Sequence, residues 1–291
     1  MAADLSAGGF RFRGMRNARM WASLVGISCM LLIWLNKFPG NLIGDTYFQA
    51  SILSYVGIAI VSLLLMMLVG SPSFEYFRLP RINLKSLIVI VLLAPMVWKY
   101  TTGDDVETKK LSIAIPGIVF LLMIGVGEEF FSRGFVFGVF RKFGQWRAIW
   151  ASSFLFGLLH LNLYIGADWD PWQAYAHVWS TFSFGVLVCA VMITTRSIWM
   201  SVLLHALLDW SVVFTSEPPP LKPYPNWQFD SLWEGFTYPL FDAFFTIFLA
   251  WVILRINRGG APRVPKWAKQ LALKWKLVTP GTDNYAFIGE N

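Results

Sequence analysis

The sequence predicts an all-α, polytopic membrane protein with about eight transmembrane helices and both termini in the cytoplasm. Three observations support this prediction. The chain is 56% apolar and only 14% charged, its apolar residues form long uninterrupted runs, and its basic residues gather in alternate connections. A mean hydropathy of +0.55 lies well above that of an ordinary soluble domain.

The apolar runs set the expected spans. A helix that crosses the hydrocarbon needs roughly 20 mostly apolar residues. Segments that meet or approach this length have the approximate limits 20–36, 48–70, 84–99, 111–138, 148–163, 172–194, 198–214 and 236–255. We expect Ser197 to cap the seventh of these helices at its N-terminus.

The charges in the connections test this count independently, since cytoplasmic connections collect Lys and Arg. With the N-terminus inside, most of the 24 basic residues fall on that side, in the segments 11–19, 78–85, 141–147, 196 and 255–276. The opposite connections hold most of the acidic residues. No cleavage site of the A-x-A type follows the first apolar run, so we expect an uncleaved signal anchor. The localisation predicted is the inner (plasma) membrane, with multiple passes.

The domain organisation predicted is one transmembrane helical domain over residues 1–256 and a basic cytoplasmic tail over 257–291. The formal charge of +7 does not indicate a nucleic-acid partner, because the basic residues lie in short runs between apolar segments. The tail either lies on anionic lipid or is solvated. Cys29 and Cys189 each sit inside an apolar run and are expected to be small buried hydrophobic residues.

Ionisable groups inside the predicted spans are the main functional signal. Such groups are costly in hydrocarbon, and they normally face a polar interior that serves a function. They fall on three spans: Glu128, Glu129 and Arg133 on the fourth, His160 on the fifth, and His205 with Asp209 on the seventh. Counted from the nearest cytoplasmic basic residue, Glu128, His160 and Asp209 each lie about 20 Å along their helices. We therefore expect these groups to meet in one layer.

Helical spacing suggests roles for the two glutamates. Adjacent positions point about 100° apart, so Glu128 and Glu129 are not expected to face the same spot. Glu129 precedes Arg133 by four residues, the favourable order for an ion pair that would hold an arginine in the membrane. We assign this pair mainly to structure. Glu128 is then free to act as a general base on water.

The two histidine segments supply the remaining groups of a water-activating site. His160 would share or orient the attacking water, and Phe156 would pack beside it one turn earlier. His205 and Asp209 share a helix face and could stabilise the negative charge that develops on a scissile carbonyl. Taken singly, each residue could equally be a hydrogen-bonded packing group; the coincidence on three helices favours a site.

These residues carry a resemblance to a known family. The chain resembles the type II CAAX prenyl proteases and the related bacteriocin-processing and abortive-infection membrane proteins. Its EExxxR motif begins at Glu128, its FxxxH motif joins Phe156 to His160, and its Hxxx(N/D) motif joins His205 to Asp209. The order and separation of the three motifs make the set specific, and the resemblance covers about residues 111–214.

The resemblance implies an eight-helix glutamate intramembrane peptidase. It implies that Glu128 and His160 activate water, and that His205 and position 209 bind the oxyanion. Many relatives have Asn at position 209, where this chain has Asp209. An ionised carboxylate would repel an oxyanion, whereas a protonated one could donate a hydrogen bond as Asn does. The segments outside the core, including the Trp-rich residues 172–179, have no counterpart in the three motifs.

The function predicted is therefore an intramembrane endopeptidase that cleaves a membrane-associated peptide or protein, with or without a lipid anchor, and uses no cofactor or metal. Three alternatives stay open. A non-catalytic relative could act as a bacteriocin-immunity, scaffold or regulatory protein. The same His, Asp and Glu side chains could bind zinc in a metal-dependent membrane hydrolase, although no HExxH motif is present. A proton-coupled carrier is suggested by Asp242 in the eighth span.

Overall fold

The computed structural model describes residue 23 and residues 25–28, 47–103, 106, 109, 111–161, 171–214 and 231–257. Every regular element of these residues is helical, which confirms the all-α prediction. In chain order the elements are α3 (Tyr47–Val69), η1 (Pro72–Tyr76), α4 (Leu84–Thr102), α5 (Leu111–Glu129), η2 (Phe130–Val136), α6 (Phe137–Arg141), α7 (Gln145–Leu159), α8 (Pro171–Thr195), α9 (Ile198–Leu208), η4 (Trp210–Val212) and α10 (Leu232–Asn257).

Among the described residues, five stretches of helix are long and apolar enough to cross a membrane, so the chain is a multi-pass membrane protein. They are Ser51–Val69, Leu84–Thr102, Leu111–Arg141, Pro171–Thr195 and Leu232–Asn257. Each overlaps a span expected from the sequence. The spans expected at 148–163 and 198–214 differ, because α7 has 15 residues and α9 has 11. The expected span 20–36 lies mostly outside the described residues, as do Cys29 and the basic tail.

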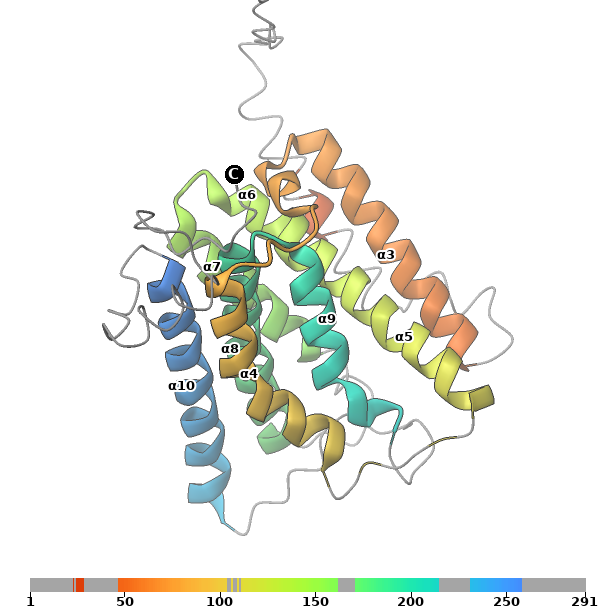
Figure 1. The fold of residues 1–291 in the computed structure, drawn as a ribbon, viewed down its shortest axis with the longest axis vertical. Coiled ribbons are helices and arrows are strands. Elements are labelled where there is room, and N and C mark those ends of the chain that lie inside the picture. The colour runs from red at the N-terminus through yellow and green to blue at the C-terminus, as the bar shows by residue number, and fades with distance from the viewer. Residues whose placement is uncertain are drawn as a thin grey trace, which may run out of the picture.

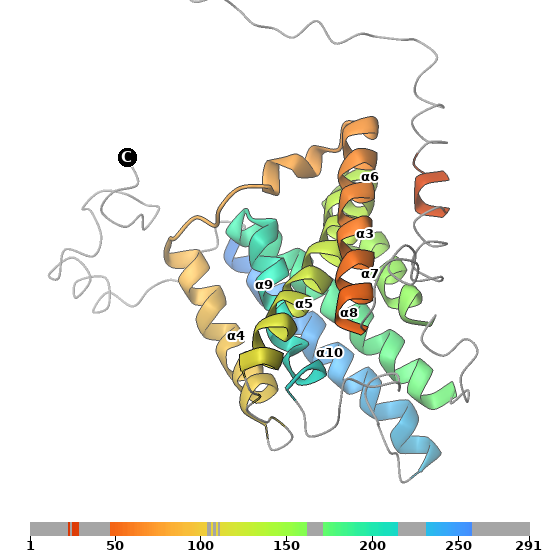
Figure 2. The same ribbon diagram turned by 90° about the vertical axis from the view of Figure 1, so that its right-hand side faces the viewer.

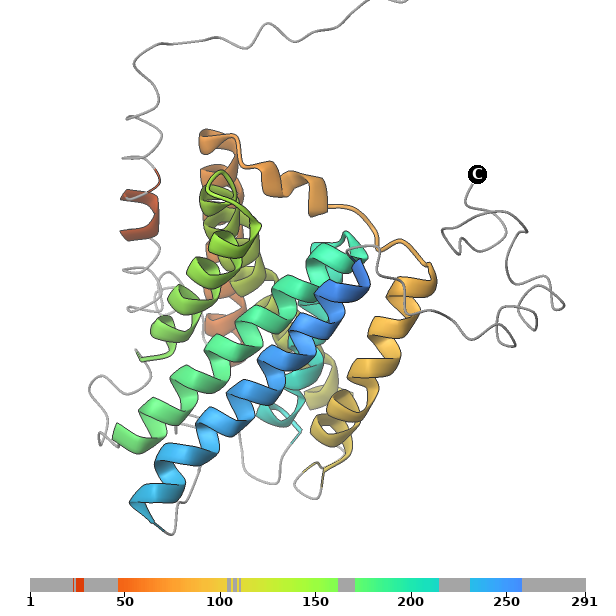
Figure 3. The ribbon, with the colours of Figure 1, turned by 90° about the vertical axis from the view of Figure 1, so that its left-hand side faces the viewer.

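Helix α8 forms the centre of the packing. It lies against α10 and α7, while α5 lies between α3 and α9 (Figure 1). Figure 3 shows α8 and α10 side by side and running in the same direction. The C-terminal half of α8 is buried on all sides, from Val186 to Thr195. Cys189 is part of this core, as its apolar surroundings in the sequence predicted.

The basic connections gather at one end of the bundle, as the topology prediction requires. The connection after η1 meets the turn between α8 and α9 there: Arg78 Nε donates to the carbonyl of Arg196 at 3.2 Å, and Ser197 Oγ donates to the carbonyl of Arg78 at 2.6 Å. Ser197 also accepts a hydrogen bond from Trp199 N–H, which confirms it as the N-cap of α9. The ends of α3 and α6 lie at the same end of the molecule (Figure 2).

Candidate functional site

The first part of the site is the point where α5 changes its winding. α5 continues without a break into η2, a π-helix of seven residues. The N–H of Phe137 donates to the carbonyl of Ser132, five residues earlier, and Ser152 Oγ of α7 donates to the same carbonyl at 2.7 Å. Such π-helical turns are rare and occur mostly at functional sites. The π-helix η2 begins directly after Glu128 and Glu129, and its hydrogen bond from Ser152 connects this segment to α7.

Arg133 lies in the π-helix and is completely buried. Its Nη1 is 3.2 Å from Glu129 Oε1, which agrees with the ion pair expected from the four-residue spacing. The guanidinium also lies 4.4 Å from the centre of the Phe156 ring. A cation that is fully removed from water is held by an opposite charge and an aromatic face together. The Glu129–Arg133 pair therefore joins the EExxxR segment to the FxxxH segment.

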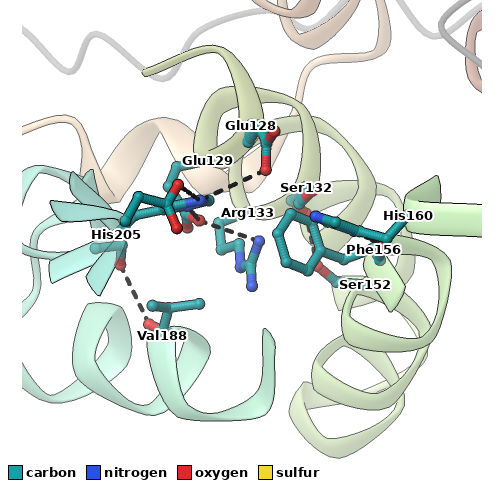
Figure 4. A network of polar contacts seen from close by, with 11 residues as sticks. Glu128, Glu129, Ser132, Arg133, Ser152, Phe156, His160, Val188 and His205 are labelled. Atoms are coloured by element: carbon teal, nitrogen blue, oxygen red, sulfur yellow. Dashed lines mark hydrogen bonds and ion pairs between the residues drawn. The ribbon is translucent and has the colours of Figure 1, made fainter. Parts of the chain in front are cut away.

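His205 occupies the centre of the charged network (Figure 4). Its Nδ1 lies 2.8 Å from Glu129 Oε1, while its Nε2 lies 3.5 Å from Glu128 Oε2 and 3.4 Å from Asp209 Oδ2. The expectation that Glu128 and Glu129 do not face the same spot is wrong, because both lie against the His205 ring. Their side chains do diverge from the helix, but the imidazole ring lies between them and presents one nitrogen to each.

His160 lies on the other side of the Phe156 ring. The two rings are 4.8 Å apart between centroids, and the His205 ring lies 5.9 Å from Phe156. The Nδ1 atom of His160 is 2.9 Å from the carbonyl of Phe156. That bond assigns the ring proton to Nδ1 and leaves Nε2 as an acceptor. In the described part of the chain His160 makes no ion pair with Glu128, so the direct partner of Glu128 is His205.

The two short helices end at the site. His160 is the residue that follows the last turn of α7, and Asp209 holds the same place after α9. Asp209 has φ −84° and ψ 9°, in the sparsely populated bridge region where many active-site residues lie. The prediction from the sequence had both residues inside longer helices, over 148–163 and 198–214. The apolar runs continue past them, so hydropathy alone gives no sign of the helix ends.

Burial divides the site into a closed part and an open part. Glu128, Glu129, Arg133 and His205 are buried, whereas the Asp209 side chain is 33% exposed and His160 is partly exposed. The Oε2 atom of Glu128 is buried without a hydrogen-bond partner among the described residues. A buried carboxylate oxygen normally has a polar partner. Its lone pairs are thus available to a water or to a substrate group.

Helix α8 contributes two residues that lie outside the three motifs. The His177 ring lies 5.0 Å from the His160 ring, and the Phe184 ring lies 5.1 Å from the His205 ring. These positions are two turns apart on one face of α8, so a single helix packs against both imidazoles. His177 is buried. It lies in the Trp-rich segment that matches no motif, although a third histidine inside a predicted span was a signal in itself.

Within the described residues no group of three or more His, Cys, Asp or Glu side chains is arranged to hold a metal ion. The network instead pairs carboxylates with an imidazole and a guanidinium. This arrangement can exchange protons and stabilise negative charge through hydrogen bonds.

A comparison with known protein families matches the part of the chain that carries these residues. A family model described as type II CAAX prenyl endopeptidase, Rce1-like, matches residues 110–211. The matched residues begin at the start of α5 and end just after Asp209, so they include all three motifs. A search of the curated proteins finds no match to the chain.

Proposed function

We propose that this chain, which carries a domain of the Rce1-like type II CAAX prenyl endopeptidase family at residues 110–211, cleaves a peptide bond by water attack inside the membrane. In this proposal Glu128 is the general base, His160 orients the water, and His205 with Asp209 stabilises the oxyanion. The observation that supports it best is the position of His205, whose ring nitrogens face carboxylates from two helices at 2.8–3.5 Å.

The water would bind between Glu128 and His160. Glu128 Oε2 has no hydrogen-bond partner among the described residues. His160 Nε2 keeps its lone pair, because Nδ1 donates to the Phe156 carbonyl. One acceptor can take the proton that the water loses while the other holds its second proton.

The oxyanion would bind at His205. Both ring nitrogens of this imidazole face carboxylate oxygens, and an imidazole donates from both nitrogens only as its cation. The Nδ1 contact to Glu129 is short, whereas the two Nε2 contacts, at 3.4 and 3.5 Å, are long for hydrogen bonds. The Nε2–H group is therefore available to a substrate oxygen, and Glu129 acts as the residue that orients the ring.

The proposed reaction proceeds in two proton-balanced steps. The water oxygen forms a bond to the scissile carbonyl carbon as its proton passes to Glu128, and the carbonyl electron pair moves to the oxygen that His205 stabilises. The carbon–nitrogen bond then breaks as the carbonyl reforms. The proton held by Glu128 passes to the leaving nitrogen, which restores the carboxylate.

The substrate that we propose is a membrane-associated peptide or protein, with or without a prenyl group. Glu128 and His205 are buried within a bundle of membrane-spanning helices, and the partly exposed Asp209 and His160 are the residues of the site that a peptide can reach first. We further propose the inner (plasma) membrane as the site of action, with the basic connections on its cytoplasmic side.

The test of this proposal is cleavage of a membrane-anchored reporter peptide by the purified protein in liposomes. Glu128→Gln removes the base and keeps the size of the side chain, so cleavage should fall by about 10²–10⁴. Glu75→Gln is the matched control, because Glu75 is exposed in η1, and it should cleave at the rate of the wild type. Equal thermal unfolding midpoints for the three proteins would exclude a folding defect.

The same assay separates the alternatives. Cleavage that persists in strong chelator argues against a metal-dependent hydrolase, and chelator-sensitive cleavage restored by zinc would support it. Unchanged biological activity of Glu128→Gln, with no cleavage by any variant, would support a non-catalytic immunity, scaffold or regulatory role instead.

A further inference from the structure

A cavity of about 380 Å³ lies at the basic end of the molecule, away from the charged network. It is formed where the end of α3 and the turn after it meet α6. Its walls include Val69, Gly70, Ser71 and Val139, and Arg141 and Lys142 border it. Val69 and Arg141 are the last residues of two membrane-spanning stretches. The cavity therefore opens at the depth where phospholipid headgroups lie.

The turn that forms one wall depends on two glycines. Gly70 has φ 62°, a left-handed conformation that glycine adopts without strain and that ends α3. Gly138 faces Ser71, and a Cβ atom at position 138 would overlap with Ser71 Oγ. Ser71 Oγ in turn donates to the carbonyl of Gly134 at 3.0 Å. The turn and α6 are thus held in close contact beside the cavity.

The two cations at the cavity have no acidic partner among the described residues. The Nε atom of Arg141 is buried and has no hydrogen-bond partner there. Lys142 Nζ lies 5.0 Å from the centre of the Phe143 ring. Proximity to helix C-termini favours cations at these positions, but it does not supply an acceptor for the buried Arg141 Nε–H. A buried donor without an acceptor indicates a missing ligand or water.

We propose that this cavity binds the phosphate group of an anionic phospholipid. Phosphate oxygens are the acceptors that arginine binds best, through short charge-assisted hydrogen bonds. The apolar walls at Val69 and Val139 suit the glycerol and the first carbons of the acyl chains. Basic pockets between helices at a membrane surface attract anionic headgroups in the same way. A headgroup that adds its own cation, such as choline, fits two unpaired cations poorly.

The experiment is native mass spectrometry of the purified protein after reconstitution with equal amounts of phosphatidylglycerol and phosphatidylcholine. The wild type should retain phosphatidylglycerol preferentially. Arg141→Gln should retain about tenfold less, and Lys142→Gln should show a smaller loss. Arg147→Gln is the matched control: it removes one charge from an exposed arginine near the same end of the molecule that does not line the cavity. Its retention should equal that of the wild type.

Three outcomes would overturn the proposal. Equal retention of phosphatidylglycerol and phosphatidylcholine by the wild type would overturn it. This comparison needs no variant, so it stays valid even if Arg141→Gln fails to fold. Equal losses in Arg141→Gln and Arg147→Gln would indicate general surface charge. Displacement of the retained lipid by millimolar inorganic phosphate would identify the free ion, rather than a phospholipid, as the ligand. Retention that resists phosphate and depends on Arg141 supports the lipid site.

Discussion

Two groups of charged residues in the described part of the chain have opposite surroundings. In the site, Glu129 and Arg133 are fully buried and 3.2 Å apart, and His205 and the Phe156 ring lie beside them. At the basic end, Arg78 and Arg147 are bonded to backbone carbonyls and lie near the surface. The same residue types thus bind backbone carbonyls at the end of the bundle, where water reaches them, and form a network of ion pairs in its interior, where water does not.

The largest expected effect comes from removing one charge of the buried network. Arg133→Met should destabilise the protein by about 3–5 kcal/mol, because the buried Glu129 loses its ion pair with the guanidinium and keeps only His205 as a charged partner. Arg147→Met, at the exposed end, should change the free energy of unfolding by less than about 0.5 kcal/mol. Unfolding followed in denaturant measures both. Similar small changes in the two variants would contradict the division between the groups.

A second prediction concerns the close packing that brings α5 to α9. A Cβ atom on Gly125 would lie 2.8 Å from the carbonyl oxygen of Val202, and backbone cannot move aside as a flexible side chain can. Gly125→Ala should cost about 1–3 kcal/mol of stability and reduce cleavage, because Glu128 and His205 sit on the two helices that are forced apart. Full cleavage activity in a destabilised variant would show that this spacing is not critical.

His177 tests whether α8 belongs to the site. His177→Ala removes the ring that packs against His160, and a loss of about 0.5–1.5 kcal/mol of aromatic contact should lower kcat by about three- to tenfold at constant KM. His177→Phe keeps an aromatic ring and should recover most of kcat. Failure of phenylalanine to restore kcat would assign a hydrogen-bonding role to the imidazole itself.

The smallest effect is expected at Asp209, the most exposed acid of the site. An Asn side chain can donate a hydrogen bond to the developing oxyanion, so Asp209→Asn should keep the cleavage rate within about threefold, which is less than about 1 kcal/mol. Asp209→Leu provides no such donor and should reduce the rate much further. A large loss in Asp209→Asn would show that the negative charge of Asp209 is required.

Much of this arrangement could be predicted from the sequence. The length of the apolar runs predicted the long spans. The basic residues in the connections predicted which connections lie at the same end of the bundle. The spacing of Glu129 and Arg133 predicted their ion pair. The motifs at Glu128, Phe156 and His205 marked the three helices that meet, and the family match at residues 110–211 covers nearly the same residues as the core expected at 111–214.

Other features depend on tertiary contacts that no local pattern contains. The π-helix after Glu129 is tied to α7 by the bond from Ser152 to Ser132, which local spacing does not show. The shared contact of two adjacent glutamates with His205 requires a flat ring that fits between them. The ends of α7 and α9 lie inside apolar runs. His177 lies outside every motif, and only packing brings it to His160.

The most direct test of the central claim compares Glu128→Gln, His160→Ala and the double variant in one cleavage assay. If both residues act on the same water, each single change should lower the rate by about 10²–10⁴, and the double variant should be no slower than the worse single variant. Losses that multiply in the double variant would mean that Glu128 and His160 act independently, and would contradict a single water-activating site.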